Sequence, residues 1–389
     1  MSSTANENGL KIAYIYDAVY PWVKGGAQKR VWEIARRMAD DHDVHLYGMR
    51  YWDGPSTIER DGVTLHGVCE PTELYAGERR SIPEALYFTE RLTAPLLRES
   101  FDVIDCQSFP YFPCFSAKAH QLLRRSAFVV TWYEVWDDYW YDYLGRKGVF
   151  GKAVERATVR LPPTIIAISE FVRGNLTNIG RKRGVDVVPN GIDFYGIDAV
   201  EPVGNDWDVI YVGRLSSHKN VDLLLDAILD AEARIGRPLD CGIIGDGPER
   251  ESLRAYAREL GLSDSVTFLG SVESDEEVIG NFKDAELFVL PSTREGFPNT
   301  ILEANACGVP SVVIDHEDNG GTAVVEDGVT GSIVEFDADA LGAEIASLLA
   351  NETTGRRMSE NAYEFARRHD WNRIVAEMET VYDRAIAKQ

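Results

Sequence analysis

The stretch that decides the fold is Glu286–Gly308, ELFVLPSTREGFPNTILEANACG. It begins with an apolar strand that ends at Pro291, continues through a polar loop, and enters a helix near Pro298–Thr300. Proline suits the first turn of a helix because its missing N–H would have no partner there. A strand that leads through a short polar loop into a helix is the repeating unit of a parallel α/β sheet.

The same alternation of strand and helix runs outward from this stretch in both directions. In the second half we expect strands at Asp208–Gly213, Cys241–Gly245, Val266–Leu269, Glu286–Pro291 and Pro310–Ile314, separated by helices such as Asn220–Asp230, Glu249–Leu260 and Thr300–Cys307. In the first half we expect strands at Lys11–Asp17, Asp43–Met49, Val63–Val68, Phe101–Gln107, Phe128–Trp132, Thr164–Ser169 and Val185–Val188, with a helix over Ala27–Asp41. Two such runs predict an α/β protein with two Rossmann-like, doubly wound parallel-sheet domains facing a cleft. We place the domains at 1–190 and 207–370, with a linker at 191–206.

Ligands of parallel α/β sheets bind beyond the carboxyl ends of the strands, and the stretch Glu286–Gly308 has residues suited to one. The free N–H groups and the dipole of the helix N-terminus favour an anion such as a diphosphate. Gly296 lets the backbone approach a ligand closely, and Glu295 lies where a carboxylate can bond sugar hydroxyls. Glu303 lies four residues beyond Asn299, on the same face of the helix, and can accept hydrogen bonds from a ribose.

Three other strand ends add weaker signals. Arg214 and Lys219 follow the strand Asp208–Gly213 and could neutralise a diphosphate, although surface ion pairing explains them equally well. Gly245 opens a turn, Gly245-Asp-Gly-Pro248, at the end of another strand. Gly25-Gly26 opens the first helix and could approach a phosphate or an acceptor, or form an ordinary loop.

The composition limits the classes of function. The 389 residues include 63 acidic and 40 basic side chains, a net charge of −23, which argues against a nucleic-acid partner. Acidity of this degree suggests a halophilic protein, whose carboxylates keep it in solution at high salt. We see neither a membrane-spanning run nor a signal peptide at the polar start, and five scattered Cys suit a reducing compartment. These features predict a cytoplasmic protein, with the inner face of the membrane left open as a location.

One segment inverts the acidic charge. Between Arg146 and Arg183 there are nine basic residues and only two acidic ones, Glu155 and Glu170. A solvated face with long side chains lying over apolar surface explains this pattern. A patch for an anionic acceptor or for peripheral membrane contact explains it as well.

Taken together, these motifs resemble family 4 of the retaining glycosyltransferases, which have the two-domain architecture called GT-B. The most specific element is Glu295-Gly-Phe-Pro-Asn-Thr-Ile-Leu-Glu303, which matches the Glu-x7-Glu motif of that family. Supporting matches are Gly25-Gly26, Ala167-Ile-Ser-Glu170, Val188-Pro-Asn-Gly-Ile-Asp193, Gly213-Arg-Leu with Lys219-Asn220, and Gly245-Asp-Gly-Pro-Glu249. Trp371 and Tyr382 look like the closing helix of the family, here 371–389, which crosses back onto the first domain.

The resemblance implies a role for each matching residue. Glu295 would contact the donor sugar, Glu303 the ribose, and Arg214 and Lys219 the diphosphate. The backbone N–H groups of Phe297, Asn299 and Thr300 would assist, and Gly270–Val272 would border the base. Many family members carry a His after the strand equivalent to Phe128–Trp132, whereas this chain has Tyr133 there. A Tyr hydroxyl can hydrogen-bond a sugar but cannot act as a base at neutral pH.

We therefore expect a retaining glycosyltransferase that needs no metal and no cofactor. It would take a nucleotide-sugar donor, such as a UDP- or GDP-sugar, and a glycan or lipid-linked acceptor, as in cell-surface polysaccharide or glycoconjugate synthesis. The three Asp-x-Asp sequences are better explained as turns and, at Asp337, as a helix N-cap than as metal sites. Two alternatives stay open: a sugar-nucleotide epimerase on the same fold, and a non-catalytic sugar-nucleotide-binding partner.

Overall fold

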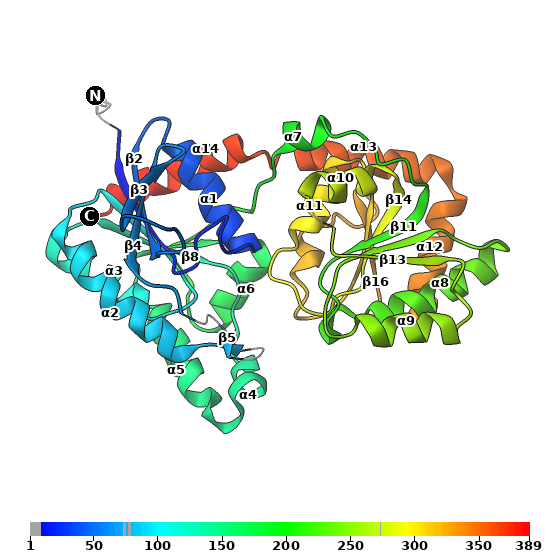
Figure 1. The fold of residues 1–389 in the computed structure, drawn as a ribbon, viewed down its shortest axis with the longest axis horizontal. Coiled ribbons are helices and arrows are strands. Elements are labelled where there is room, and N and C mark those ends of the chain that lie inside the picture. Colours follow the sequence, from blue (N-terminus) through cyan, green and yellow to red (C-terminus); the bar gives the residue numbers. More distant parts are fainter. Residues whose placement is uncertain (1–8, 73–74, 77–78, 273) are drawn as a thin grey trace. The chain divides into compact units, whose positions relative to one another are not determined.

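The computed structural model describes residues 9–72, 75–76, 79–272 and 274–389. The chain forms two compact units (Figure 1). The first comprises residues up to Pro189 together with Trp371–Gln389, and the second is continuous from Asn190 to Asp370. No helix in the described ranges combines the length and the apolar character needed to cross a bilayer.

The first unit is built on an eight-stranded sheet in the order β10-β9-β8-β7-β1-β2-β4-β3. All neighbouring pairs are parallel except β3 with β4, which are antiparallel. The strands are β1 (Lys11–Ile15), β2 (Asp43–Met49), β3 (Thr57–Arg60), β4 (Val63–Cys69), β7 (Val103–Gln107), β8 (Ala127–Trp132), β9 (Thr164–Ala167) and β10 (Val185–Val187), with a separate hairpin of β5 (Tyr75–Ala76) and β6 (Arg79–Arg80). The central strands β7 and β8 are buried throughout, as strands covered on both faces must be.

The first unit also contains helices, and the longer ones are amphipathic. The helices are α1 (Gly26–Met38), α2 (Ile82–Arg98), α3 (Pro113–Arg124), α4 (Tyr139–Leu144), η1 (Gly145–Lys147), α5 (Gly148–Thr158), α6 (Glu170–Asn178) and α14 (Trp371–Ile386). The edge strand β3, the hairpin β5–β6 and helix α2 were not predicted from the sequence. The last helix, α14, packs beside α1 in the same hydrophobic core (Figure 1).

Buried hydrogen bonds fasten α14 to the first unit. The hydroxyl of Tyr382 donates to Asp105 Oδ2 at 2.7 Å and lies 3.2 Å from the hydroxyl of Tyr14. Thr131 Oγ1 also donates to Asp105, and the fully buried Arg30 of α1 donates to the carbonyl oxygen of Val188 at 3.0 Å. Burial raises the pKa of Asp105 to about 6, although these hydrogen bonds oppose the shift. The last helix is therefore joined to the sheet by polar contacts as well as by apolar packing.

The second unit has a six-stranded, wholly parallel sheet in the order β13-β12-β11-β14-β15-β16. Its strands are β11 (Trp207–Val212), β12 (Cys241–Ile244), β13 (Val266–Gly270), β14 (Ala285–Leu290), β15 (Ser311–Ile314) and β16 (Gly331–Val334). Its helices are α7 (Phe194–Asp198), η2 (Ser217–Lys219), α8 (Val221–Ile235), α9 (Arg250–Glu259), α10 (Asp275–Lys283), α11 (Asn299–Ala306), η3 (Gly320–Ala323), α12 (Ala338–Ala350) and α13 (Glu352–Arg367). The two units confirm the prediction of two Rossmann-like parallel-sheet domains.

Candidate active site

The predicted donor-binding residues of the second unit gather at the point where its strand order reverses. β11 and β14 are neighbours, while the chain continues outward from β11 to β12 and from β14 to β15. The loops that follow these two strands lead away in opposite directions, which opens a crevice at the carboxyl ends of the strands. Residues 213–220 form one loop and residues 291–298 the other.

A salt bridge joins the two loops. Lys219 Nζ donates to Glu295 Oε1, and the two side chains are only 16% and 12% exposed. This low exposure distinguishes the pair from the surface ion pairs of the chain, because solvent screens it less. Two residues that were expected to serve one ligand are therefore in direct contact with each other.

Asn220 aligns the same two loops through its side chain. It adopts the left-handed conformation at φ 48°, directly before α8. Its amide nitrogen donates to the carbonyl oxygens of Pro291 at 3.0 Å and of His218 at 3.2 Å. The backbone N–H of Thr293 donates to the same carbonyl of His218 at 3.0 Å, so the loops are held together by their main chains as well.

The backbone of Glu295 is held from its other side by the segment that follows β15. The N–H of Gly320 donates to the carbonyl oxygen of Glu295 at 2.7 Å, and the N–H of Glu295 donates to Asp318 at 3.1 Å. A Cβ on Gly320 would lie 2.2 Å from the carbonyl oxygen of Gly296, so only glycine fits there. The position of Glu295 is thus fixed by three separate segments of the second unit.

Helix α11 begins at Asn299, within the predicted range, and Pro298 is its N-cap residue. No side chain caps this helix, and its first turn contains no acidic residue. Its first N–H groups, including those of Asn299 and Thr300, therefore suit an anion. The side chain of Asn299 accepts a hydrogen bond from Asn190 Nδ2 at 2.7 Å, and Glu303 lies one turn further along, partly buried.

The loop after β12 adjoins the loop after β11. Gly245 has φ 144°, and a Cβ there would lie 1.9 Å from the carbonyl oxygen of Gly213. The N–H of Leu215 donates to the carbonyl of Asp246 at 3.0 Å. Gly245 is therefore required by close backbone approach, whereas Val272, beyond β13, is a partly buried residue that packs on the core of the unit.

Cations dominate the electrostatics of these loops. Arg214 is exposed, and Lys219 is half-buried beside Glu295. Burial lowers the pKa of His218, and the charge of Lys219 lowers it further, so the imidazole is neutral at neutral pH. Burial raises the pKa of the Tyr211 hydroxyl, and the nearby carboxylate of Glu295 acts in the same direction. The arrangement thus combines fixed positive charge and N–H donors with the carboxylate of Glu295.

The remaining predicted residues belong to the first unit. α1 begins at Gly26, and Gly25 is its N-cap residue, in an extended conformation with φ 172°. Tyr133 follows β8, and its hydroxyl donates to Gln107 Oε1 at 2.6 Å. Burial raises the pKa of Tyr133, which agrees with the expectation that it is no base.

The basic segment between Arg146 and Arg183 is partly neutralised by acidic residues just before it. Lys152 pairs with Asp137 at 2.9 Å and with Asp138 at 2.5 Å, and Arg156 pairs with Asp137 at 3.1 Å. Within the described ranges, Arg146 and Lys147 form no ion pair. A count over sequence positions alone overstates the net charge of this surface.

The sequence analysis did not predict several residues that support the loops of the candidate site. Asn190, Asn220 and Gly320 support the donor-side loops, and only the first two lie in motifs that had been singled out.

Outside these loops, His45 Nδ1 lies 2.7 Å from His66 Nε2 in the first unit. With Glu99 they form a cluster whose potential ligand atoms lie within 4.8 Å of one another, but Lys11 already pairs with Glu99 at 2.8 Å.

Both units match glycosyltransferase families. Residues 24–194 match the model of Glycosyltransferase Family 4, and residues 197–365 match the model of Glycosyl transferases group 1. Two glycosyltransferase models thus match successive parts of the chain, and its two parallel-sheet units have the GT-B fold.

Individual proteins agree with this class. An uncharacterized glycosyltransferase of Methanocaldococcus jannaschii is 28% identical over 56% of this chain and 59% of its own length. Alpha-D-kanosaminyltransferase of Streptomyces kanamyceticus is 35% identical over 43% of this chain and 41% of its own. The matches thus span about half the length of these curated relatives. The solved structure of Anabaena HepE in complex with UDP and glucose is 18% identical, covers 96% of this chain and 99% of its own, and has a TM-score of 0.73.

Proposed function

We propose that this protein is a glycosyltransferase that moves a sugar from a nucleotide diphosphate donor to an acceptor hydroxyl. The observation that carries the proposal is the arrangement at the β11–β14 switch point. Lys219 and Glu295 are in contact there, next to a helix N-terminus without a capping side chain. This set combines a cation and N–H donors for a diphosphate with a carboxylate for a sugar. HepE, which shares the fold, was solved with UDP and glucose.

In this proposal the second unit binds the donor. Arg214, Lys219 and the N–H groups at the start of α11 stabilise the charge that develops on the leaving diphosphate. The diphosphate competes with Glu295 for the ammonium of Lys219, which frees the carboxylate to accept hydrogen bonds from the sugar hydroxyls. Gly296 and Phe297 bring the main chain close to the phosphates, Glu303 accepts from the ribose, and Gly245 and Val272 border the nucleoside.

The finer features of the reaction follow from the resemblance to family 4. We propose retention of configuration, with the acceptor attacking from the leaving-group face and a phosphate oxygen of the donor taking its proton. Arg214 and Lys219 supply the positive charge, so we expect transfer to proceed in the presence of a chelator. The first unit, with Gly25, Gly26 and the sugar-contacting Tyr133, receives a glycan or lipid-linked acceptor of cell-surface synthesis, in the cytoplasm or at the inner face of the membrane.

The test is a nucleotide-release assay over a panel of UDP- and GDP-sugars with extracted cell lipids as acceptors, in buffer containing EDTA. Transfer that depends on both donor and lipid, and that Glu303→Ala reduces at least tenfold, is the expected result. Full transfer rates in both Glu295→Ala and Arg214→Ala would refute the assignment of the site. Epimerised donor without transfer, or nucleotide binding without turnover, would instead support the two alternatives, which no contact of the site favours.

A further inference from the structure

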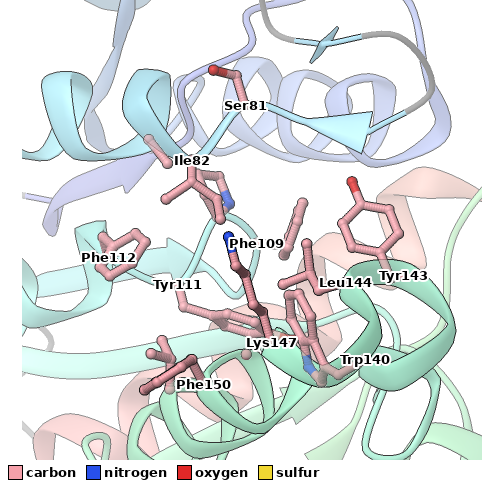
Figure 2. Close-up of a pocket in the computed structure, with 14 residues that line it drawn as sticks. Ser81, Ile82, Phe109, Tyr111, Phe112, Trp140, Tyr143, Leu144, Lys147 and Phe150 are labelled. Atoms are coloured by element: carbon pink, nitrogen blue, oxygen red, sulfur yellow. The ribbon is translucent and has the colours of Figure 1, made fainter.

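The first unit contains an apolar pocket that the donor site does not use. It has a volume of about 290 Å³, far more than the roughly 10–15 Å³ that one water requires. It lies between the start of α2, the loop after β7, and the segment from α4 through η1 to α5 (Figure 2). Its lining is almost entirely apolar, and its aromatic members are Phe109, Tyr111, Phe112, Trp140, Tyr143 and Phe150.

A buried carboxylate holds the walls of this pocket in place. Glu155 is fully buried and accepts hydrogen bonds from Tyr111 Oη at 2.9 Å and from Trp140 Nε1 at 3.3 Å. It also accepts from the backbone N–H groups of Trp136 at 2.8 Å and Asp137 at 2.9 Å. Because both aromatic walls are bonded to the same carboxylate, the pocket is preformed rather than a gap that side-chain movement would fill.

Two glycines let α5 approach Trp140 closely. A Cβ on Gly151 would lie 2.3 Å from Trp140 Cε3, and a Cβ on Gly148 would lie 2.3 Å from the carbonyl oxygen of Trp140. A further aromatic ring packs on Trp140, since Trp136 lies 4.7 Å away between ring centroids with the planes tilted by 47°. The pocket therefore has a rigid aromatic floor.

Exposed apolar side chains and cations occur among the lining residues and their immediate neighbours in the chain. Phe150 is 71% exposed, and Val149 and Ile82 are each 49% exposed. Lys147 lines the pocket and is exposed, and its neighbour Arg146 is exposed too. Within the described ranges neither cation has an ion-pair partner, in a chain with a net charge of −23. Apolar surface rimmed by unpaired positive charge marks a binding site for a ligand with an apolar body and an anionic end.

We propose that this pocket binds the hydrocarbon chain of a phosphate-bearing lipid acceptor, with Lys147 and Arg146 at the phosphate. A peptide fits less well, because its backbone N–H and C=O groups would find few partners along these walls. A hydrocarbon chain needs none, and each methylene that it removes from water favours binding. This inference rests on the proposed function, of which it specifies the acceptor.

The test uses dodecyl phosphate below its micelle concentration, with binding measured by isothermal titration calorimetry. We expect saturable one-to-one binding, at least tenfold tighter than that of dodecyl maltoside, and no response to inorganic phosphate alone. Lys147→Glu should weaken binding at least tenfold. Lys182→Glu, the same charge change at another exposed position of the basic segment, should change it less than twofold. Leu144→Trp, which fills the pocket, should abolish binding while binding of nucleoside diphosphate to the second unit is kept.

Three results would overturn the proposal: no saturable binding of dodecyl phosphate, equal binding by Lys147→Glu and Lys182→Glu, or full binding by Leu144→Trp. Binding only to vesicles of anionic phospholipid, without a one-to-one complex with the single-chain probe, would also overturn it and would indicate membrane docking. The measurement requires no turnover. Loss of nucleotide binding with intact lipid binding would therefore contradict the proposed function and not the pocket.

Discussion

Lys219 Nζ donates a hydrogen bond to Glu295 Oε1, and this contact joins the loops after β11 and β14 across 76 positions of the chain. Both side chains are largely shielded from water, so the pair is a charge-assisted hydrogen bond with structural value as well as two binding groups. Replacing either Lys219 or Glu295 therefore also removes a hydrogen-bond partner of the other residue.

Replacing Lys219 should weaken binding of the nucleoside diphosphate. In Lys219→Ala the diphosphate loses a charge-assisted hydrogen bond worth roughly 1.5–3 kcal/mol, which corresponds to a 10–100-fold higher Kd by titration calorimetry. Glu295→Gln should instead leave this Kd within about threefold and lower the transfer rate at least tenfold, because it affects the sugar. Arg356→Ala, which removes an exposed ion pair with Glu352, is the control. Equal effects of Lys219→Ala and Glu295→Gln on Kd would contradict the division of roles.

Gly245→Ala should destabilise the second unit and weaken nucleotide binding. The new Cβ would meet the carbonyl oxygen of Gly213, only 1.9 Å away, so two loops must separate. Gly236→Ala is the matched control, because Gly236 also has a positive φ, 79°, but nothing lies within 4 Å of its Cβ position. We expect about 1 kcal/mol of destabilisation at Gly236 and clearly more at Gly245 in urea unfolding. Equal losses of unfolding free energy in the two variants would show that the strained φ angle, rather than the contact with Gly213, determines the destabilisation.

Acidification from pH 6.5 to pH 4 should remove the stability that His66 contributes to the first unit. Burial, together with the neighbouring His45, lowers the pKa of His66 to about 4 from its ordinary value of 6.5. Its folded pKa is depressed, so its contribution is present above the unfolded pKa and is lost as the pH falls through the folded one. His66→Phe keeps an aromatic ring against Tyr47, which stacks at 4.4 Å, and removes the titration. Denaturant unfolding of both proteins across this range isolates the contribution of His66, because Asp105 and the other titrating groups are common to both. The wild type should lose about 2 kcal/mol relative to His66→Phe, a figure reduced for the partial exposure of the ring.

Tyr382→Phe should loosen α14. The change removes the donor that lies 2.7 Å from Asp105 Oδ2 and leaves that buried oxygen short of a partner, at a cost of about 1–3 kcal/mol. Hydrogen exchange of the amides of α14 should accelerate accordingly. Tyr195→Phe, at a side chain that is 66% exposed, should have no measurable effect. Unchanged protection of α14 in Tyr382→Phe would show that apolar packing alone holds the helix.

The sequence predicted those parts of the fold that depend on local pattern. β2 has the predicted bounds, and β14 and α11 differ from the prediction by a residue or two, because apolar runs and strand–loop–helix transitions are visible in neighbouring residues. Asp337 caps α12, accepting from Ala340 N, as its place before a helix indicated. The short edge strand β3 has alternating exposure and no apolar run, so local pattern gave it no signal.

The supporting contacts of the site could not be predicted in the same way. The close approach of Gly320 to the carbonyl oxygen of Gly296 arises only when β14 and β15 lie side by side. The hydrogen bond from Asn220 to the carbonyl oxygen of Pro291 likewise requires that β11 and β14 are neighbours. The pocket beside Trp140 likewise depends on Glu155, which in the sequence was one of two acidic residues in a basic segment. The hydrogen bonds that its buried carboxylate accepts hold the aromatic residues around it.

The position of α14 has a consequence for biosynthesis. The second unit is one uninterrupted segment, whereas the first unit needs residues from both sides of it. A ribosome therefore delivers every residue of the second unit before it delivers Tyr382, so that unit can fold while translation continues. Until the last helix emerges, Asp105 lacks one of its donors and the apolar surface that α14 covers stays open to solvent. We therefore expect the nascent first unit to be most prone to chaperone binding before α14 emerges, because its apolar surface is then uncovered.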